Sequence, residues 1–353
     1  FIMTRHQLRA ACLAVVLAGT ATSSSLSGQS PREWRDYAGG PDSSRFVAAR
    51  QIDKTNVSRL AVAWTFPGGQ TDFNPLVVGG VIYTKGPGTS FVALDAATGQ
   101  QIWSHEGVQG FASRGINYWQ SADGSDRRLI FSTANLLQEL DAKTGAPITT
   151  FGTNGVVDLR VGLDRDPTTI NQQSRTPGRV FENLLILGSA TNQEYTSAPG
   201  DIRAFDVRTG ALTWTFHTVP RPGEFGYETW PKDAYKTATG LMPWPGQSLD
   251  EERGIVYVST KTAEPDFYGG ERKGNNLYSS SLVAIDAGSG KPVWHFQSVH
   301  HDIWDYDVSA PPLLTEVRRG STMVPAVIQN TKQGFVFVFD RTNGTPLFPI
   351  EER

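Results

Sequence analysis

A short phrase that occurs five times constrains the fold of this chain most. In each copy an apolar run ends in Asp, a turn containing Gly follows, and a second run usually leads to Trp. The copies are ALDAATGQQIW at 93–103, ELDAKTGAPIT at 139–149, AFDVRTGALTW at 204–214, AIDAGSGKPVW at 284–294 and VFDRTNGTPLF at 338–348. Repetition on this scale with strand-like flanks predicts a radial or stacked all-β array.

The phrase also has a physical reading as a hairpin. The Asp side chain can accept hydrogen bonds from turn amides, Gly supplies a positive φ, and the Trp that follows can pack between neighbouring blades. Runs rich in Val, Ile, Phe and Tyr lie between such turns. We therefore expect four-stranded blades around an axis, with strands in 79–86, 128–141, 183–190, 254–260 and 326–340 and an opening strand at 61–66.

Composition narrows the function classes. The 353 residues could bury a large core, and the formal net charge is only −3, with acidic and basic residues interspersed. No run of Lys or Arg is present that would indicate a nucleic acid or an anionic membrane surface as partner. The sequence therefore argues against nucleic-acid binding.

The first 28 residues differ from the rest. Arg5, His6 and Arg9 precede an apolar stretch at 10–21 and a run of small residues at 22–28. This order is typical of a secretory signal peptide and is too short for a transmembrane helix; a fraying N-terminal helix is the alternative. We expect a periplasmic or secreted protein whose mature part, 29–353, has no transmembrane segment and no disulfide, since Cys12 is the only cysteine.

The densest group of chemically reactive residues is VHHDIWDYDVSAPP at 299–312. It contains His300, His301, Asp302, Asp305 and Asp307 within eight positions. A solvated strand face is one reading, and a zinc site built from the two histidines is another. Because the segment is a long excursion from the β repeats, where sites are usually built, we favour a functional site.

This segment, together with NTKQGFVFVFDRTNGTPLF at 330–348, resembles the pyrroloquinoline-quinone (PQQ)-dependent dehydrogenases, which include quinoprotein glucose and alcohol dehydrogenases. The resemblance extends from about residue 34 to 353. It implies an eight-bladed β-propeller with tryptophan-docking repeats, present here as a partial propeller whose C-terminal blades are missing. It also implies PQQ as cofactor, and it is closer to the glucose-type than to the methanol-type enzymes.

The resemblance assigns roles to four residues. Asp305 matches the general base that takes the substrate hydroxyl proton while hydride passes to the quinone. Lys332 matches the cation that hydrogen-bonds the quinone oxygens, and Arg114, in SRGINYW, matches the residue that binds a carboxylate or carbonyl of the cofactor. Trp244 matches the aromatic residue below the quinone.

Ser174 and Ser189 are weaker candidates for hydrogen bonds to the cofactor, because both also read as ordinary strand-end hydroxyls. The resemblance further implies a calcium ion, for which Asn192, Glu264 and Asp305 are the expected ligands. Here the chain departs from the family: the acid and the amide appear in exchanged positions.

Two other departures bear on function. The stretch 108–113 lacks the cysteine pair that covers the quinone in methanol-type enzymes, so we expect Phe111 to cover that face, and no Cys-x-x-Cys-His haem motif is present. The expected partners are a sugar or alcohol substrate and a separate electron acceptor, a cytochrome or the quinone pool. The alternative is a non-catalytic propeller that serves as a scaffold, which would need the repeats but not Asp305, Lys332, Arg114 and Trp244 together.

Overall fold

The computed structural model describes residues 33–68, 73–189 and 197–351, and they form five antiparallel sheets. The first sheet contains β1 (Leu76–Val78), β2 (Val81–Lys85), β3 (Phe91–Asp95) and β4 (Gln101–His105). The second contains β5 (Asn117–Gln120), β6 (Arg127–Thr133), β7 (Leu136–Asp141) and β8 (Val156–Asp158). The third contains β9 (Arg179–Phe181), β10 (Leu184–Leu187), β11 (Ile202–Asp206) and β12 (Leu212–Phe216).

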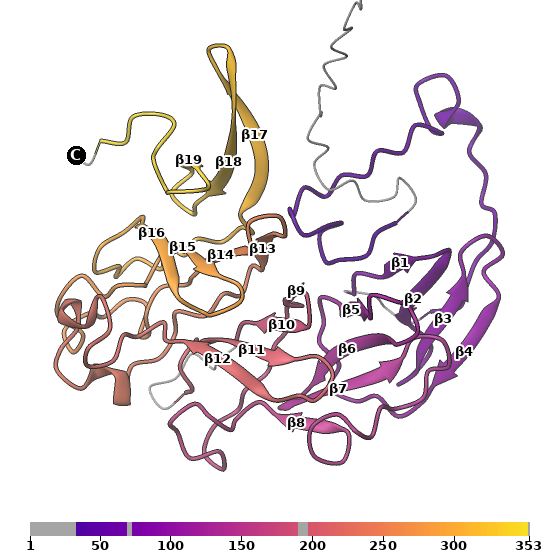
Figure 1. Ribbon diagram of the computed structural model, residues 1–353, viewed down its shortest axis with the longest axis horizontal. Helices are drawn as coiled ribbons and strands as arrows, with labels where there is room; N and C mark the ends of the chain where they lie inside the picture. The colour runs from indigo at the N-terminus through magenta and orange to yellow at the C-terminus, as the bar shows by residue number, and fades with distance from the viewer. Residues whose placement is uncertain (1–32, 69–72, 190–196, 352–353) are drawn as a thin grey trace, which may run out of the picture.

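The fourth sheet contains β13 (Gln247–Asp250), β14 (Ile255–Ser259), β15 (Ser281–Asp286) and β16 (Pro292–Gln297). The fifth has three strands, β17 (Leu313–Arg319), β18 (Thr322–Asn330) and β19 (Val336–Asp340). In every sheet the strands pair in chain order, and the sheets succeed one another along an arc (Figure 1). The expected all-β propeller with four-stranded blades is confirmed for the first four sheets.

Helix is nearly absent from the described residues. It is confined to the short 3-10 turns η1 (Val57–Arg59), η2 (Tyr227–Thr229) and η3 (Ala234–Lys236). Within the same residues no helix has the length and apolar character needed to cross a membrane. The expected signal peptide at 1–28 lies outside the described residues.

Each repeated Asp ends the third strand of its sheet and organises the turn that follows. The Asp206 carboxylate, for example, accepts from the Thr209 amide at 2.9 Å and the Thr209 hydroxyl at 3.0 Å. Gly210, next in the turn, has a φ of +75°, a conformation that favours glycine. The same arrangement at the other copies explains why the phrase recurs.

The tryptophans connect each blade to the next through this turn. Indole nitrogens donate to the carbonyl of the residue that follows the repeated Asp in the next blade: Trp64 to Ala96, Trp103 to Ala142, Trp214 to Ala287 and Trp294 to Arg341, at 3.0–3.2 Å. A Cβ at the turn glycine would strike the same ring, as at Gly290, where it would lie 2.5 Å from Trp214. Tryptophan docking is therefore present as predicted.

The junction between the second and third blades differs. The second repeat ends in Thr149 where the others carry an aromatic residue, and no tryptophan reaches the Asp206 turn. Instead, the Arg128 guanidinium donates to the Val207 carbonyl at 3.0 Å, and Glu139 holds the same guanidinium nitrogen at 2.8 Å. Arg128 thus makes the hydrogen bond that an indole makes elsewhere.

The apolar core lies mainly between neighbouring sheets. One cluster joins Trp214 and Ile186 of the third blade to Val256 and Ile285 of the fourth. Such burial of large apolar side chains is the main driving force for folding. The interfaces between neighbouring blades therefore contain most of the apolar core.

Three strand predictions need correction. Residues 61–66 form no strand, because they have no hydrogen-bonded neighbour strand, and Trp34 pairs with Val77 at the edge of β1 instead. The run 128–141 is divided into β6 and β7 by a turn in which Ala134 has a φ of +48°, and the run 326–340 is divided into β18 and β19 by a turn at 331–335. These errors arise because pairing partners and tight reversals cannot be read from an apolar run alone.

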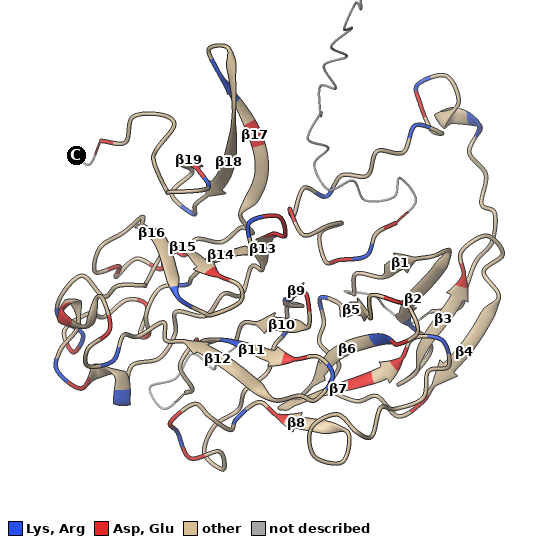
Figure 2. Ribbon diagram, in the orientation of Figure 1, with Lys and Arg blue, Asp and Glu red and all other residues tan. Residues whose placement is uncertain are grey.

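The ends of the strands form two opposite sides of the blades, which we call edges. The turn edge carries the Asp turns, which lie where β3, β7, β11, β15 and β19 end. At the opposite edge the first strand of each blade begins and the second ends, as the pairing of Gln247 with Val258 and of Leu313 with Ile328 shows. Figure 2 shows acidic and basic segments interspersed along the chain.

Candidate active site

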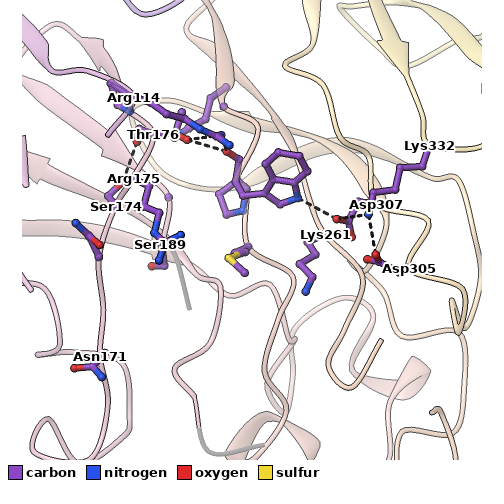
Figure 3. Close-up of a pocket in the computed structure, with 18 residues that line it drawn as sticks. Arg114, Asn171, Ser174, Arg175, Thr176, Ser189, Lys261, Asp305, Asp307 and Lys332 are labelled. Carbon is purple, nitrogen blue, oxygen red and sulfur yellow. Dashed lines mark hydrogen bonds and ion pairs between the residues drawn. The ribbon is translucent and has the colours of Figure 1, made fainter. Parts of the chain in front are cut away.

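A cavity of about 720 Å³ lies at the edge opposite the Asp turns. Its walls are the loops that precede β5, β9, β13 and β17 and the residues that follow β10, β14 and β18. Four cationic residues and two acidic residues line it: Arg114, Arg175, Lys261, Lys332, Asp305 and Asp307. Figure 3 shows Arg114 and Arg175 on one side, and Lys261, Lys332 and both aspartates on the other.

Asp305, Asp307 and Lys332 form one ionic group. The Lys332 ammonium lies 2.9 Å from Asp305 Oδ2 and 3.0 Å from Asp307 Oδ2 (Figure 3). Asp305 and Lys332 are each about one-third exposed, whereas Asp307 is buried. Asp305 therefore combines a fixed position with access to a ligand in the cavity.

Burial and the neighbouring charges have opposite effects on the pKa values of Asp307 and Lys332. Burial raises the pKa of Asp307, against the lowering effect of the Thr262 amide and of Lys332. Burial also lowers the pKa of Lys332, but its hydrogen bonds to the two aspartates outweigh this, so the pKa of Lys332 is raised. Lys332 thus stays an ammonium ion near neutral pH.

Asp302 organises the loop that carries Asp305. Its fully buried carboxylate accepts from the amides of Trp304 and Tyr306, each at 2.9 Å, and from the hydroxyls of Ser280, at 2.7 Å, and Thr262. The loop therefore wraps around one carboxylate. Asp305 then adopts a φ of +57°, a sparsely populated conformation that aspartate tolerates better than most residues.

Arg114 and Trp244 form the other part of the cavity wall. The Arg114 guanidinium lies 5.2 Å from the Trp244 ring centre and donates to the Trp244 carbonyl and, at 3.0 Å, to the Thr176 hydroxyl. The Trp244 indole donates to Asp307 Oδ2 at 3.1 Å. Trp244 thus connects the Arg114 side of the cavity to the Asp307–Lys332 side.

Ser174 and Ser189 also line the cavity, but each hydroxyl already donates its proton to a backbone carbonyl. Ser174 donates to the Thr176 carbonyl and Ser189 to the Asp201 carbonyl, both at 2.9 Å. Each hydroxyl oxygen can still accept a hydrogen bond. A role in cofactor binding stays a prediction for both.

Of the three expected calcium ligands, the two described ones, Glu264 and Asp305, are each engaged by a lysine. Asn192 lies outside the described residues, and Glu264 does not line the cavity but forms an ion pair with Lys261. Burial raises the pKa of Glu264, against the effect of Lys261. Among the described residues no group of three His, Cys, Asp or Glu side chains could hold a metal ion. Because Glu264 and Asp305 are each paired with a lysine ammonium, these two ligands do not fit calcium.

Two other expectations find no support. Phe111 stacks on Phe131 at 4.9 Å and packs against the core of the first two blades instead of lining the cavity. The His301 ring contacts the Gly274 carbonyl at 2.8 Å and belongs to no metal group within the residues described here.

Sequence reasoning missed several residues of the cavity. Asp307 was singled out as part of the cluster without a role, although it holds both Lys332 and Trp244. Arg175, Thr176 and Lys261 were not singled out. The only sequence signal for Lys261 is that it directly follows the expected strand at 254–260.

The lining suits a planar anion with several acidic groups. Among the lining residues four cations outnumber two carboxylates, although Glu264 and Asp266 pair with Lys261 behind the wall, and the cavity volume is within the usual range for small-ligand sites. These features fit the tricarboxylate quinone that the resemblance implies.

Fold and cavity together define a β-propeller with a cationic ligand site at one edge of its blades. The family model of the glucose/ethanol/alcohol dehydrogenase β-propeller domain matches residues 34–353. The chain belongs to this family of PQQ-dependent dehydrogenases.

Curated relatives agree. The chain is 32% identical to quinoprotein glucose dehydrogenase A of Acinetobacter calcoaceticus over 94% of its own length and 46% of the relative's. It is 31% identical to the quinate/shikimate dehydrogenase (quinone) of Acinetobacter baylyi over 91% of its own length and 44% of the relative's. The chain thus spans about half the length of the curated relatives it matches.

Among solved structures, a quinohemoprotein alcohol dehydrogenase of Pseudomonas putida HK5 superposes with a TM-score of 0.73 at 28% identity, over 90% of this chain and 48% of that one. The propeller architecture and the family membership are therefore established.

Proposed function

We propose that this protein oxidises a hydroxyl group of a sugar or an alcohol, with PQQ as hydride acceptor and Asp305 as general base. The observation that carries the proposal is the meeting of Asp305, Lys332, Arg114 and Trp244 at one cavity. When bound, the quinone supplies the site that accepts hydride. We propose that the electrons then pass to a separate acceptor, a cytochrome or the quinone pool.

Each residue contributes a separate function in this proposal. Asp305 takes the hydroxyl proton of the substrate, for which an accessible carboxylate at a fixed position is required. Lys332, held by two aspartates, presents an ammonium to anionic oxygens of the ligand. Arg114 binds a carboxylate, and the Trp244 ring offers a flat apolar surface.

Asp307 is a positioning residue in the same proposal. Its Oδ1 accepts from the Thr262 amide at 2.9 Å, and its Oδ2 accepts from both Lys332 and Trp244. One buried carboxylate thereby fixes the distance between the ammonium and the indole. We also propose a periplasmic or secreted location, which rests on the sequence at 1–28.

The test is reconstitution of the full chain with PQQ. Binding is followed by quenching of tryptophan fluorescence, and turnover by reduction of an artificial electron-accepting dye with aldoses, polyols and simple alcohols as substrates. We expect PQQ to bind and at least one substrate class to reduce the dye. Absence of PQQ binding under all conditions would favour the alternative, a non-catalytic scaffold.

A further inference from the structure

Lys261 is a buried lysine that faces the cavity. It lies two residues after the end of β14, its side chain is only 3% exposed, and it is among the residues that line the cavity. Burying a charged side chain is costly unless the charge is paired. We therefore ask which groups pair with the buried Lys261 ammonium.

Two acidic residues beyond the cavity wall hold this ammonium. Lys261 Nζ donates to Glu264 Oε1 and lies 3.2 Å from Asp266 Oδ1. Both carboxylates are nearly buried, with 5% and 12% exposure. A lysine ammonium has three N–H donors, so pairing with two carboxylates leaves one donor for a ligand in the cavity.

Glu264 was expected to bind a divalent ion, together with Asn192 and Asp305. Calcium requires six to eight oxygen ligands, but the Glu264 oxygen is already engaged by Lys261, and Asp305 is paired with Lys332. The described residues offer this side of the cavity an ammonium ion with two counter-charges, and not an oxygen cage. Figure 3 shows Lys261 on the same side of the cavity as Lys332 and Asp305.

We infer that Lys261 supplies the fixed positive charge that this side of the cavity directs at anionic oxygens of the quinone, in the role that the calcium prediction gave to a divalent ion. The inference rests on the proposed function. Glu264 and Asp266 act as positioning residues, because they hold the ammonium at the cavity wall. Cofactor binding should then be independent of divalent cations.

The experiment measures PQQ affinity of the full chain by fluorescence quenching, once in EDTA and once with added CaCl₂, with metal content determined by mass spectrometry. The wild type should bind PQQ equally in both. Lys261→Met should bind about ten- to a hundredfold more weakly in EDTA, the range expected for loss of one charged hydrogen bond. Added calcium should restore part of this loss, because Glu264 and Asp266 are then free to bind the ion.

Lys291→Met is the matched control, since this exposed lysine follows the repeated Asp286 at the other edge, and it should leave PQQ affinity unchanged. Lys261→Arg, which keeps the charge, should retain most of the affinity and guards against a Met variant that fails to fold. Thermal unfolding of each variant reports on folding.

The outcomes separate the two proposals. PQQ binding by the wild type only in the presence of calcium would overturn the role of Lys261 and leave the proposed function standing. Unchanged affinity of a folded Lys261→Met in EDTA would do the same. Failure of the wild type to bind PQQ with or without calcium would overturn both.

Discussion

The two edges of the blades use aspartate in contrasting ways. At one edge, each repeated Asp is satisfied by its own turn, two or three residues away, as Asp206 is by Thr209. At the other edge, Asp305 and Asp307 are held by Lys332, 27 and 25 residues away, and Asp307 also by Trp244. Contacts that recur from blade to blade build the scaffold, whereas contacts that occur once build the site.

The comparison predicts that substitutions at one edge affect mainly stability and substitutions at the other affect mainly activity. Substitutions at the cavity edge should reduce turnover with little change in stability. Substitutions at the turn edge should do the reverse.

The largest effect is expected from Asp305→Asn. Loss of a general base typically reduces the rate about 10²- to 10⁴-fold, while the amide keeps the shape of the side chain. We expect kcat to fall by this factor, with PQQ affinity and Tm close to those of the wild type, measured by dye reduction and thermal unfolding. Full turnover would remove the proposed role of Asp305.

Trp214→Ala should give the largest loss of stability. It deletes a buried ring and its hydrogen bond to Ala287, and substitutions of this kind cost about 3–5 kcal/mol. The measurement is urea-induced unfolding. Trp304→Ala is the matched control at the cavity edge: this ring is 66% exposed, so the free energy of unfolding should change by less than about 0.5 kcal/mol.

Glu139→Gln tests the junction that uses Arg128. Burial raises the pKa of Glu139 to about 8, against the lowering effect of Arg128, and Oε1 has no partner among the described residues. Because the folded pKa exceeds the unfolded one, the stability from this group is present below the unfolded value and is lost as pH rises toward 8. Between pH 5 and 8 the Tm of the wild type should fall relative to that of the variant, by about 2 °C or more. Parallel Tm curves would contradict the assigned shift.

The smallest effect is expected at a single turn. Asp286→Ala removes hydrogen bonds from the Ser289 amide at 2.8 Å and the Ser289 hydroxyl at 2.6 Å. Both are exposed to solvent, so we expect a loss of about 1 kcal/mol in unfolding free energy with unchanged turnover. Asp286→Asn keeps an acceptor oxygen and should lose less; an equal loss would argue that charge matters more than the hydrogen bonds.

Much of the fold was predictable because its determinants recur along the sequence. The Asp turns, their glycines and the docking of Trp103, Trp214 and Trp294 all follow from one repeated phrase. The grouping of Asp305, Lys332, Arg114 and Trp244 at one cavity was also expected, although their chemical roles stay proposals.

The remainder depended on contacts between distant segments. Nothing in the sequence near Arg128 indicates that it would replace a tryptophan, since Arg128 lies outside the repeated phrase and its partner is Val207, 79 residues away. The pairing of Lys261 with Glu264 was equally hidden, because a calcium site and an ammonium site use the same acids. Residues 61–66 have strand-like composition, but pairing, not composition, decides whether a strand forms.

The Arg128 junction shows that the acceptor of the inter-blade hydrogen bond is constant whereas its donor varies. At all five Asp turns the carbonyl of the residue after the repeated Asp accepts this bond, from an indole at four turns and from a guanidinium at the Asp206 turn. A comparison of related propellers that requires a tryptophan at every junction would miss this one, whereas a structural comparison based on the accepting carbonyl would find all five.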